Sequence, residues 1–276
     1  MRGWWRDLSD LVLPAECGGC GAPRTELCRK CRAALDEAAP CRVRPVPEPP
    51  GLPVVYAAAP YSDEVRATLL AHKERGALAL AGPLGAALAG AVRAGLRQAR
   101  TETGGGRSGR GDLPVLLVPV PSARWALRSR GHDPVRRIAL AAADALRRSG
   151  TPARVTAVLR QRRSVADQSG LDSGQRLDNL AGALRTAVGS ARLLRGRVVL
   201  VDDLMTTGAS LAEAARAVRV TAGHDGGTTP VYARATREGR EERTAGSRES
   251  REERTGQWVR AAVVAAPPDS FEINRN

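Results

Sequence analysis

The chain has 276 residues, 42% of them hydrophobic but only 3% aromatic, so we expect an aliphatic core of Ala, Val and Leu. This excludes a fibrous or wholly disordered protein, and the length suits one large domain with a small appendage. The net charge of +14 favours anionic partners, although a coding bias towards Arg explains the surplus equally well. No apolar run reaches the roughly 18 residues of a membrane span. Asp7 and Asp10 interrupt any secretory segment, so a cytoplasmic protein is expected.

The N-terminal segment carries two Cys-x2-Cys pairs: Cys17, Cys20, Cys28 and Cys31. Four thiolates form the ligand set of a tetrahedral, structural Zn²⁺ site, and Gly21 suits the turn that follows the first pair. Two tight pairs in one short stretch favour zinc over unrelated reduced thiols. Disulfides are disfavoured without a secretion signal. Cys41 stands apart and is not counted as a ligand.

Beyond a proline-rich stretch, Pro40–Pro53, that predicts an extended linker, apolar runs alternate with helical periodicity. The predicted strands are Val54–Ala59, Val115–Val120, Val155–Leu159, Val198–Val201 and Val259–Ala265. The predicted helices are Asp63–Lys73, Leu78–Leu96, Val135–Arg147 and Leu211–Val218. Strands alternating with helices indicate an α/β fold with a largely parallel sheet flanked by helices. His72 is expected on a helix face or rim.

Two segments lack periodicity. Thr101–Asp112 is rich in Gly, Arg and Ser and predicts a loop. Gly223–Gln257 includes Arg237–Arg254, where six Arg and six Glu cancel in charge. Low hydrophobicity favours disorder there, and a charged, solvent-exposed helix is the alternative. Val231–Ala235 is a candidate short strand before this tract.

The most informative segment is Val198–Ser210, an apolar strand that ends in Asp202 and Asp203 and continues as Leu-Met-Thr-Thr-Gly-Ala-Ser into a helix. Gly208 lets the backbone approach a ligand closely. Free amide groups at the helix start bind phosphate. Carboxylates one step away suit sugar hydroxyls or a Mg²⁺ ion. Together these features predict a site for a ribose 5-phosphate.

Other interpretations of this segment are weaker. A hydrophobic run ending in Asp-Asp is also typical of a Walker B strand, but the chain has no Walker A loop. The first strand of a receiver domain carries a similar acid pair, but near the start of its domain. Capping of a helix by Thr207 or Ser210 is the third alternative.

The segment resembles the signature of type I phosphoribosyltransferases, which bind phosphoribosyl pyrophosphate (PRPP) together with Mg²⁺. The resemblance implies that Asp202 and Asp203 contact the ribose hydroxyls. It also implies that the following turn binds the 5-phosphate. That turn comprises Thr206, Thr207, Gly208, Ala209 and Ser210.

Nearly the whole chain resembles the ComF, or competence-type, phosphoribosyltransferases. The resemblance is carried by the cysteine-rich head, Tyr61–Arg66 with His72-Lys73, Val118–Ser122 with its following arginines, and Gln168–Gly182. It implies a pyrophosphate loop formed by Pro121, Ser122, Ala123 and Arg124. Where many relatives have Phe-Asn-Gln, this chain has His132-Asp133-Pro134, and Asp133 is a candidate N-cap with Pro134 opening the helix.

These observations predict a zinc-binding head (1–45), a phosphoribosyltransferase domain (46–222), a disordered insertion (223–257), and a final strand and tail (258–276). The expected activity is displacement of pyrophosphate from Mg²⁺–PRPP by an unidentified acceptor. Asp202, Asp203 and Arg124 would act at the reacting centre. The alternative is an accessory protein of DNA uptake or processing, which binds single-stranded DNA or competence proteins and keeps PRPP as a bound ligand or a relic site. The oligomeric state is open.

Overall fold

The computed structural model describes residues 16–36, 39–102, 113–122, 127, 130–162, 180–223 and 259–271. The central strands are β1 (Cys41–Val43), β2 (Val55–Pro60), β3 (Val115–Pro119), β4 (Ala153–Val155), β7 (Arg197–Leu204) and β8 (Val259–Ala266). They form one sheet in the order β1-β2-β8-β7-β3-β4. Every neighbouring pair is parallel except the antiparallel pair of β1 and β2. This confirms the predicted α/β fold with a largely parallel sheet.

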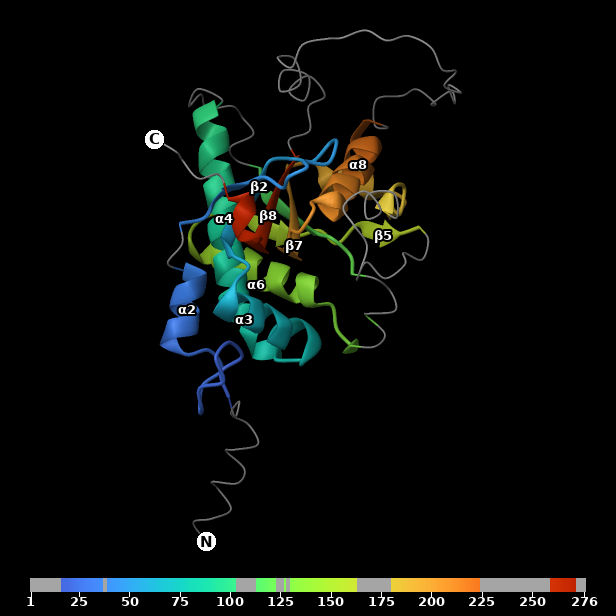
Figure 1. The fold of residues 1–276 in the computed structure, drawn as a ribbon. Helices are drawn as coiled ribbons and strands as arrows, with labels where there is room; N and C mark the ends of the chain where they lie inside the picture. The colour runs from blue at the N-terminus through green and yellow to red at the C-terminus, as the bar shows by residue number, and fades with distance from the viewer. Residues whose placement is uncertain are drawn as a thin grey trace.

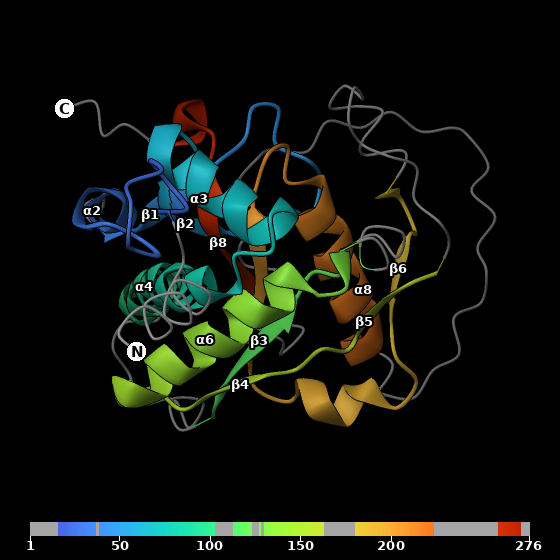
Figure 2. The same ribbon diagram turned by 90° about the horizontal axis from the view of Figure 1, so that it is seen from below.

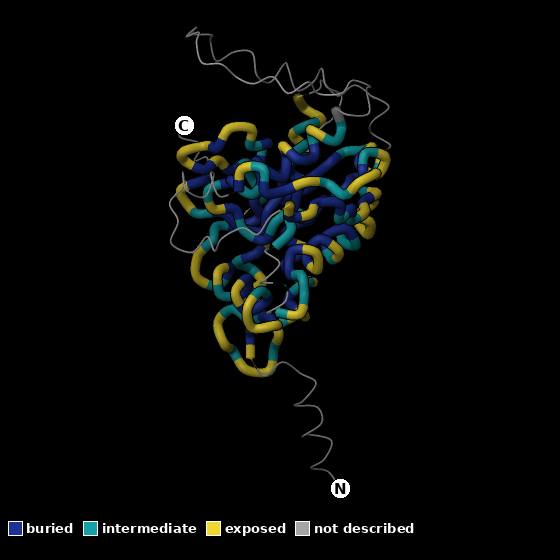
Figure 3. Tube along the Cα trace, turned by 90° about the vertical axis from the view of Figure 1, so that its right-hand side faces the viewer, coloured by how far each residue is buried: buried dark blue, intermediate teal, exposed yellow. Residues whose placement is uncertain are grey.

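Helices cover both faces of this sheet (Figures 1 and 2). They are α2 (Arg29–Asp36), α3 (Asp63–Glu74), α4 (Ala81–Glu102), α6 (Pro134–Arg148) and α8 (Ala209–Gly223), with short 3-10 turns at Leu78–Leu80, Ser190–Leu194 and Pro268–Ser270. α4 and α6 pack on one face, and α8 packs on the other. Because the inner strands are buried on both faces, their sequences are continuous apolar runs. Buried residues accordingly fill the centre of the molecule (Figure 3).

The structure differs from the sequence-based prediction in several places. Thr101 and Glu102 of the predicted loop Thr101–Asp112 belong to α4, and residues 103–112 lie outside the described residues. The predicted strand Val155–Leu159 is wrong, because the chain turns between β4 and a separate strand β5 (Leu159–Gln161). β5 pairs with β6 (Leu184–Thr186) in an antiparallel ribbon beside α8. The expected linker Pro40–Pro53 contains the edge strand β1. The sequence did not predict this strand, because prolines flank it on both sides. The predicted segment Gly223–Gln257, with its candidate strand Val231–Ala235, lies outside the described residues except for Gly223 at the end of α8.

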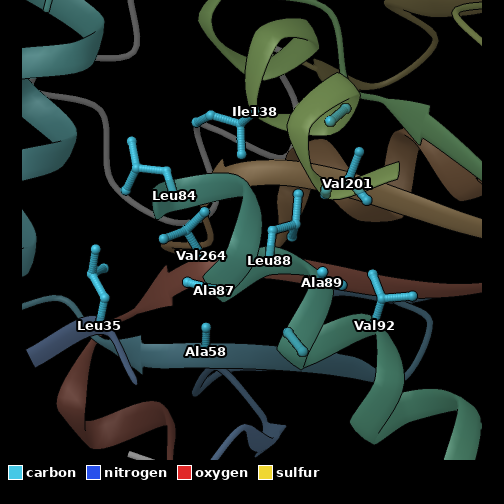
Figure 4. Packing of buried hydrophobic residues seen from close by; sticks show 14 of the residues in the cluster. Leu35, Ala58, Leu84, Ala87, Leu88, Ala89, Val92, Ile138, Val201 and Val264 are labelled. Atoms are coloured by element: carbon cyan, nitrogen blue, oxygen red, sulfur yellow. The ribbon is translucent and has the colours of Figure 1, made fainter. Parts of the chain in front are cut away.

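The core is aliphatic, as the composition predicts. Leu84, Leu88 and Val92 of α4 lie in one buried cluster with Val201 of β7 and Val264 of β8 (Figure 4). The cysteine-rich segment joins the same core, since four of its side chains are buried with these residues: Cys17, Leu27, Cys31 and Leu35. The head is therefore packed against the sheet domain and is not an isolated appendage.

The run Leu78–Glu102 has the length and mean hydropathy of a membrane span. The sequence did not predict a span here, because polar residues interrupt its apolar stretches. About 56% of its most apolar window is buried inside the protein. Its apolar side chains pack on β2, β8 and α6, as in a core helix.

The crossing of α4 and α6 depends on a glycine. A Cβ on Gly85 would lie 2.8 Å from the backbone nitrogen of Ala142, which cannot move away as a flexible side chain could. We therefore expect Gly85→Ala to lower the free energy of unfolding by about 1–3 kcal/mol, the usual cost of overpacking. Gly82→Ala is the matched control in the same helix, because a Cβ there meets nothing within 4 Å. Denaturant unfolding of both variants checks this, and equal stabilities would contradict it.

Candidate functional site

The strand order predicts one crevice, at the carboxyl edge of the sheet. β3 leads through α6 to the edge strand β4, whereas β7 leads through α8 on the other face towards β8, so the order reverses between β3 and β7. Ligands of open parallel sheets bind outside the strand ends at such a reversal. The amide of Val120 donates to the carbonyl of Val201 over 2.9 Å, which holds the two strand ends side by side. Pro121 and Ser122 leave β3 here, next to the end of β7.

The turn between β7 and α8 has the features expected of an anion site. Gly208 has a φ of 76°, in the left-handed region that favours glycine. Within the described residues, several amide groups of this turn have no hydrogen-bond partner: those of Thr206, Thr207, Gly208 and Ser210. The amide of Ala209 makes only a long contact, 3.5 Å, to the Thr207 hydroxyl. Unpaired donors at a helix start attract an anion through direct hydrogen bonds and through the helix dipole.

The two acids at the end of β7 have different surroundings. Asp203 is 5% exposed, and one of its carboxylate oxygens lies 2.9 Å from Nζ of Lys73. Burial opposes its ionisation, but the attraction and hydrogen bond of Lys73 prevail and lower the pKa of Asp203. Burial and the neighbouring Asp203 carboxylate raise the pKa of Asp202 well above its ordinary value. Asp202 is half-buried, and its Oδ1 accepts a hydrogen bond from the Asp203 amide.

Lys73 was part of the family-like pattern in the sequence, but its contact with Asp203 could not be predicted. It lies at the end of α3, some 130 residues before its partner, and no periodicity links the two. Asp203 raises the pKa of Lys73, so the ammonium is charged at neutral pH. The site therefore contains its own cation.

The residues around the departure from the family pattern have structural roles. Asp133 caps α6 by accepting a hydrogen bond from the Arg136 amide at 3.0 Å, with Pro134 in the first turn, as the sequence suggested. Arg130 donates two hydrogen bonds to Glu74. His72 is buried rather than on a rim, because its ring lies between the carbonyls of Ala77 and Pro134, and burial lowers its pKa.

The segment between β1 and β2 lies over the turn before α8. A Cβ on Gly208 would come within 3.0 Å of the Leu52 side chain, and the Arg219 guanidinium of α8 donates to the Gly51 carbonyl over 2.8 Å. Any substitution of Gly208 would therefore both strain the backbone and disturb this cover. The crevice thus receives one wall from the N-terminal part of the chain.

A second residue that the sequence analysis missed is Glu213 on α8. Its carboxylate accepts hydrogen bonds from the Leu184 amide of β6 at 2.9 Å and from Arg216. Burial opposes its ionisation, but these donors lower the pKa of Glu213. This buried contact fixes α8, and with it the turn at its start, against the ribbon.

The structure thus brings together most residues of the predicted ribose phosphate site. Asp202, Asp203 and the turn from Thr206 to Ser210 share one sheet edge, and Pro121 and Ser122 lie at the end of the neighbouring strand. Ala123 and Arg124 lie outside the described residues.

The four cysteines of the head form a separate candidate metal centre. The Sγ atoms of Cys17, Cys20, Cys28 and Cys31 all lie within 4.8 Å of one another. Sulfur atoms around a tetrahedral zinc stand roughly 3.8 Å apart, given a Zn–S distance of about 2.3 Å, so the cluster fits a structural metal such as zinc.

The backbone around the cysteine cluster is adapted to it. Burial alone would raise the pKa of Cys17, but amides including that of Cys28 lower it to about 6. Gly21 has a φ of 77° at the predicted turn, and a Cβ on Gly19 would collide with the Cys31 side chain.

Comparison of the chain with protein-family models and with curated proteins finds no match. Its function must therefore be inferred from the geometry of these two sites.

We expect one zinc ion per chain, bound by the four clustered thiolates. Metal analysis of the purified protein checks this. Cys17→Ser should lose the ion and lower the thermal midpoint, because Cys17 lies in the core. Cys41→Ser is the control, since Cys41 lies on β1 outside the cluster and should leave the metal content unchanged. A well-folded wild-type head without metal would contradict the assignment.

Proposed function

We propose that the chain is a ComF-like type I phosphoribosyltransferase that binds PRPP with Mg²⁺. The proposal rests on one observation: an acid pair and a turn of unpaired amides lie together at one reversal of strand order. Sugar hydroxyls need acceptors, and a terminal phosphate needs donors. A ribose 5-phosphate satisfies both at this spacing.

In this proposal, Asp202 accepts hydrogen bonds from the ribose hydroxyls, and the turn from Thr206 to Ser210 binds the 5-phosphate. The loop that begins with Pro121 and Ser122 receives the pyrophosphate, because it leaves the neighbouring strand across the reversal. Mg²⁺ would neutralise charge on the pyrophosphate. Of the two acids, Asp202 would be the one able to help hold this ion, because Lys73 already neutralises Asp203.

The reaction is a substitution at the anomeric carbon of the ribose. The bond to pyrophosphate breaks and its electron pair leaves with pyrophosphate, while a nucleophilic atom of the acceptor forms the new bond. The ring gathers positive charge in the transition state, which the carboxylate of Asp202 stabilises. No nucleophilic side chain is required, so holding the two reactants in line supplies much of the rate.

Calorimetric titration of PRPP with Mg²⁺ tests the proposal. PRPP at 100 times its dissociation constant should raise the free energy of unfolding by about 2.7 kcal/mol, if the unfolded chain does not bind. Asp202→Asn should weaken binding without unfolding the chain, because the amide retains an oxygen for the Asp203 N–H. Asp144→Asn is the control, since Asp144 is an exposed carboxylate on α6 with its own arginine partners.

The same titration distinguishes the proposed function from the alternative, which is DNA binding. Binding of single-stranded DNA through arginines would fall steeply with salt and would not depend on Asp202. If wild type ignores PRPP but binds single-stranded DNA equally well before and after Asp202→Asn, the proposal is wrong. Gly208→Val is a poor test here, because the positive φ alone makes that variant unstable.

A further inference from the structure

Four consecutive residues at the end of α3 and its C-cap contact three other parts of the molecule. His72 faces the Pro134 carbonyl, Lys73 pairs with Asp203, Glu74 pairs with Arg130, and Arg75 donates to the Gly18 carbonyl in the head. α3 is thereby fixed between the cysteine cluster, the start of α6 and the end of β7. The position of Lys73 is set by contacts on both sides.

The contact with Asp203 uses only part of the hydrogen-bonding capacity of Lys73. Its side chain is 33% exposed, whereas that of Asp203 is 7% exposed. An ammonium group has three hydrogens to donate, and in the part of the chain that the structure describes, Asp203 is its hydrogen-bond acceptor. Among the described residues the other two hydrogens have no acceptor, so they can serve a ligand.

The side of the sheet on which Lys73 lies identifies the part of the ligand that it meets. Val199 and Val201 belong to the core beneath α4 and α6, so Asp203, two residues on, faces the same side. The α8 turn belongs to the opposite side. Arg130 acts electrostatically on Lys73, and Pro134 contacts its neighbour His72. Both belong to the segment that follows Pro121 and Ser122. Lys73 is therefore on the pyrophosphate side of the crevice.

The charges give Lys73 a function there. A pyrophosphate group next to two carboxylates would be repelled unless a cation stood between them. Arg130 is already paired with Glu74 in a two-bond contact, which leaves Lys73 as the cation nearest the acid pair among the described residues. Resting on the function proposed above, we propose that Lys73 binds the pyrophosphate group of PRPP while it keeps its ion pair with Asp203. It would select pyrophosphorylated sugars over ribose 5-phosphate.

Two ligands test this inference by calorimetry. Lys73→Met should lower the affinity for PRPP by roughly tenfold or more, the effect of losing one charged hydrogen bond. It should change the affinity for ribose 5-phosphate by less than about twofold. Lys73→Arg should restore much of the PRPP affinity. Lys30→Met is the matched control: Lys30 is the only other lysine, lies on α2 and pairs with Glu64 at the start of α3. It removes the same charge and should leave both affinities unchanged.

A role limited to holding Asp203 is tested separately. Asp203→Asn removes the carboxylate that needs a counter-ion, so Lys73→Met in that background leaves no unpaired buried charge. A binding role predicts a further loss of PRPP affinity in the double variant, and a purely structural role predicts none. As a second readout, PRPP should protect Lys73 from amine acylation, measured by mass spectrometry, while Lys30 stays reactive.

The outcomes distinguish this inference from the proposed function. If wild type binds neither PRPP nor ribose 5-phosphate, the proposed function fails, and this inference fails with it. If wild type binds both and Lys73→Met weakens both equally, or neither, the function stands and the role of Lys73 is wrong.

Discussion

The reversal of strand order between β3 and β7 is the constraint on which the candidate site depends. It sends α6 to one face of the sheet and α8 to the other, so the two loops diverge and leave a crevice at the carboxyl edge. A sheet wound in one direction only would have carried both helices to the same face. The acid pair and the unpaired amides are functional candidates because they stand at this opening and not elsewhere along the edge.

Small residues bring the supporting helices close to that edge. Gly85 allows α4 to approach α6 at backbone distance, and Gly95 lies against the ring of Tyr56 on β2. The cysteine head completes this packing, since a Cβ on Gly18 would collide with Leu80 just before α4. The head thus packs against one side of α3, while Lys73 of the same helix pairs with Asp203 in the site. A metal in the head would stabilise the segment that packs against the C-terminal half of α3, the half that carries Lys73.

The local pattern of apolar and polar residues predicted most of the fold. Apolar runs located β2, β3, β7 and β8, and helical spacing located α3, α4, α6 and α8. It failed at Cys41–Val43, where three residues between prolines become a strand only by pairing with β2. In the site, the strand, acids and glycine of Val198–Ser210 were visible because they are contiguous. Lys73 and Glu213 were assigned no role because their partners, Asp203 and Leu184, are distant in sequence.

The acid pair shows how one ion pair sets the properties of two neighbouring residues. Two neighbouring carboxylates, one half-buried and one buried, repel each other, so a cation beside them favours their ionisation. Lys73 pairs with Asp203 and lowers its pKa, whereas burial and the Asp203 carboxylate raise the pKa of Asp202. Asp202 is therefore the acid without an ion pair of its own among the described residues. A ligand that offers hydroxyl donors to Asp202 and negative charge to Lys73 would satisfy both groups at once. Such a ligand relieves the repulsion within the pair and does not add to it.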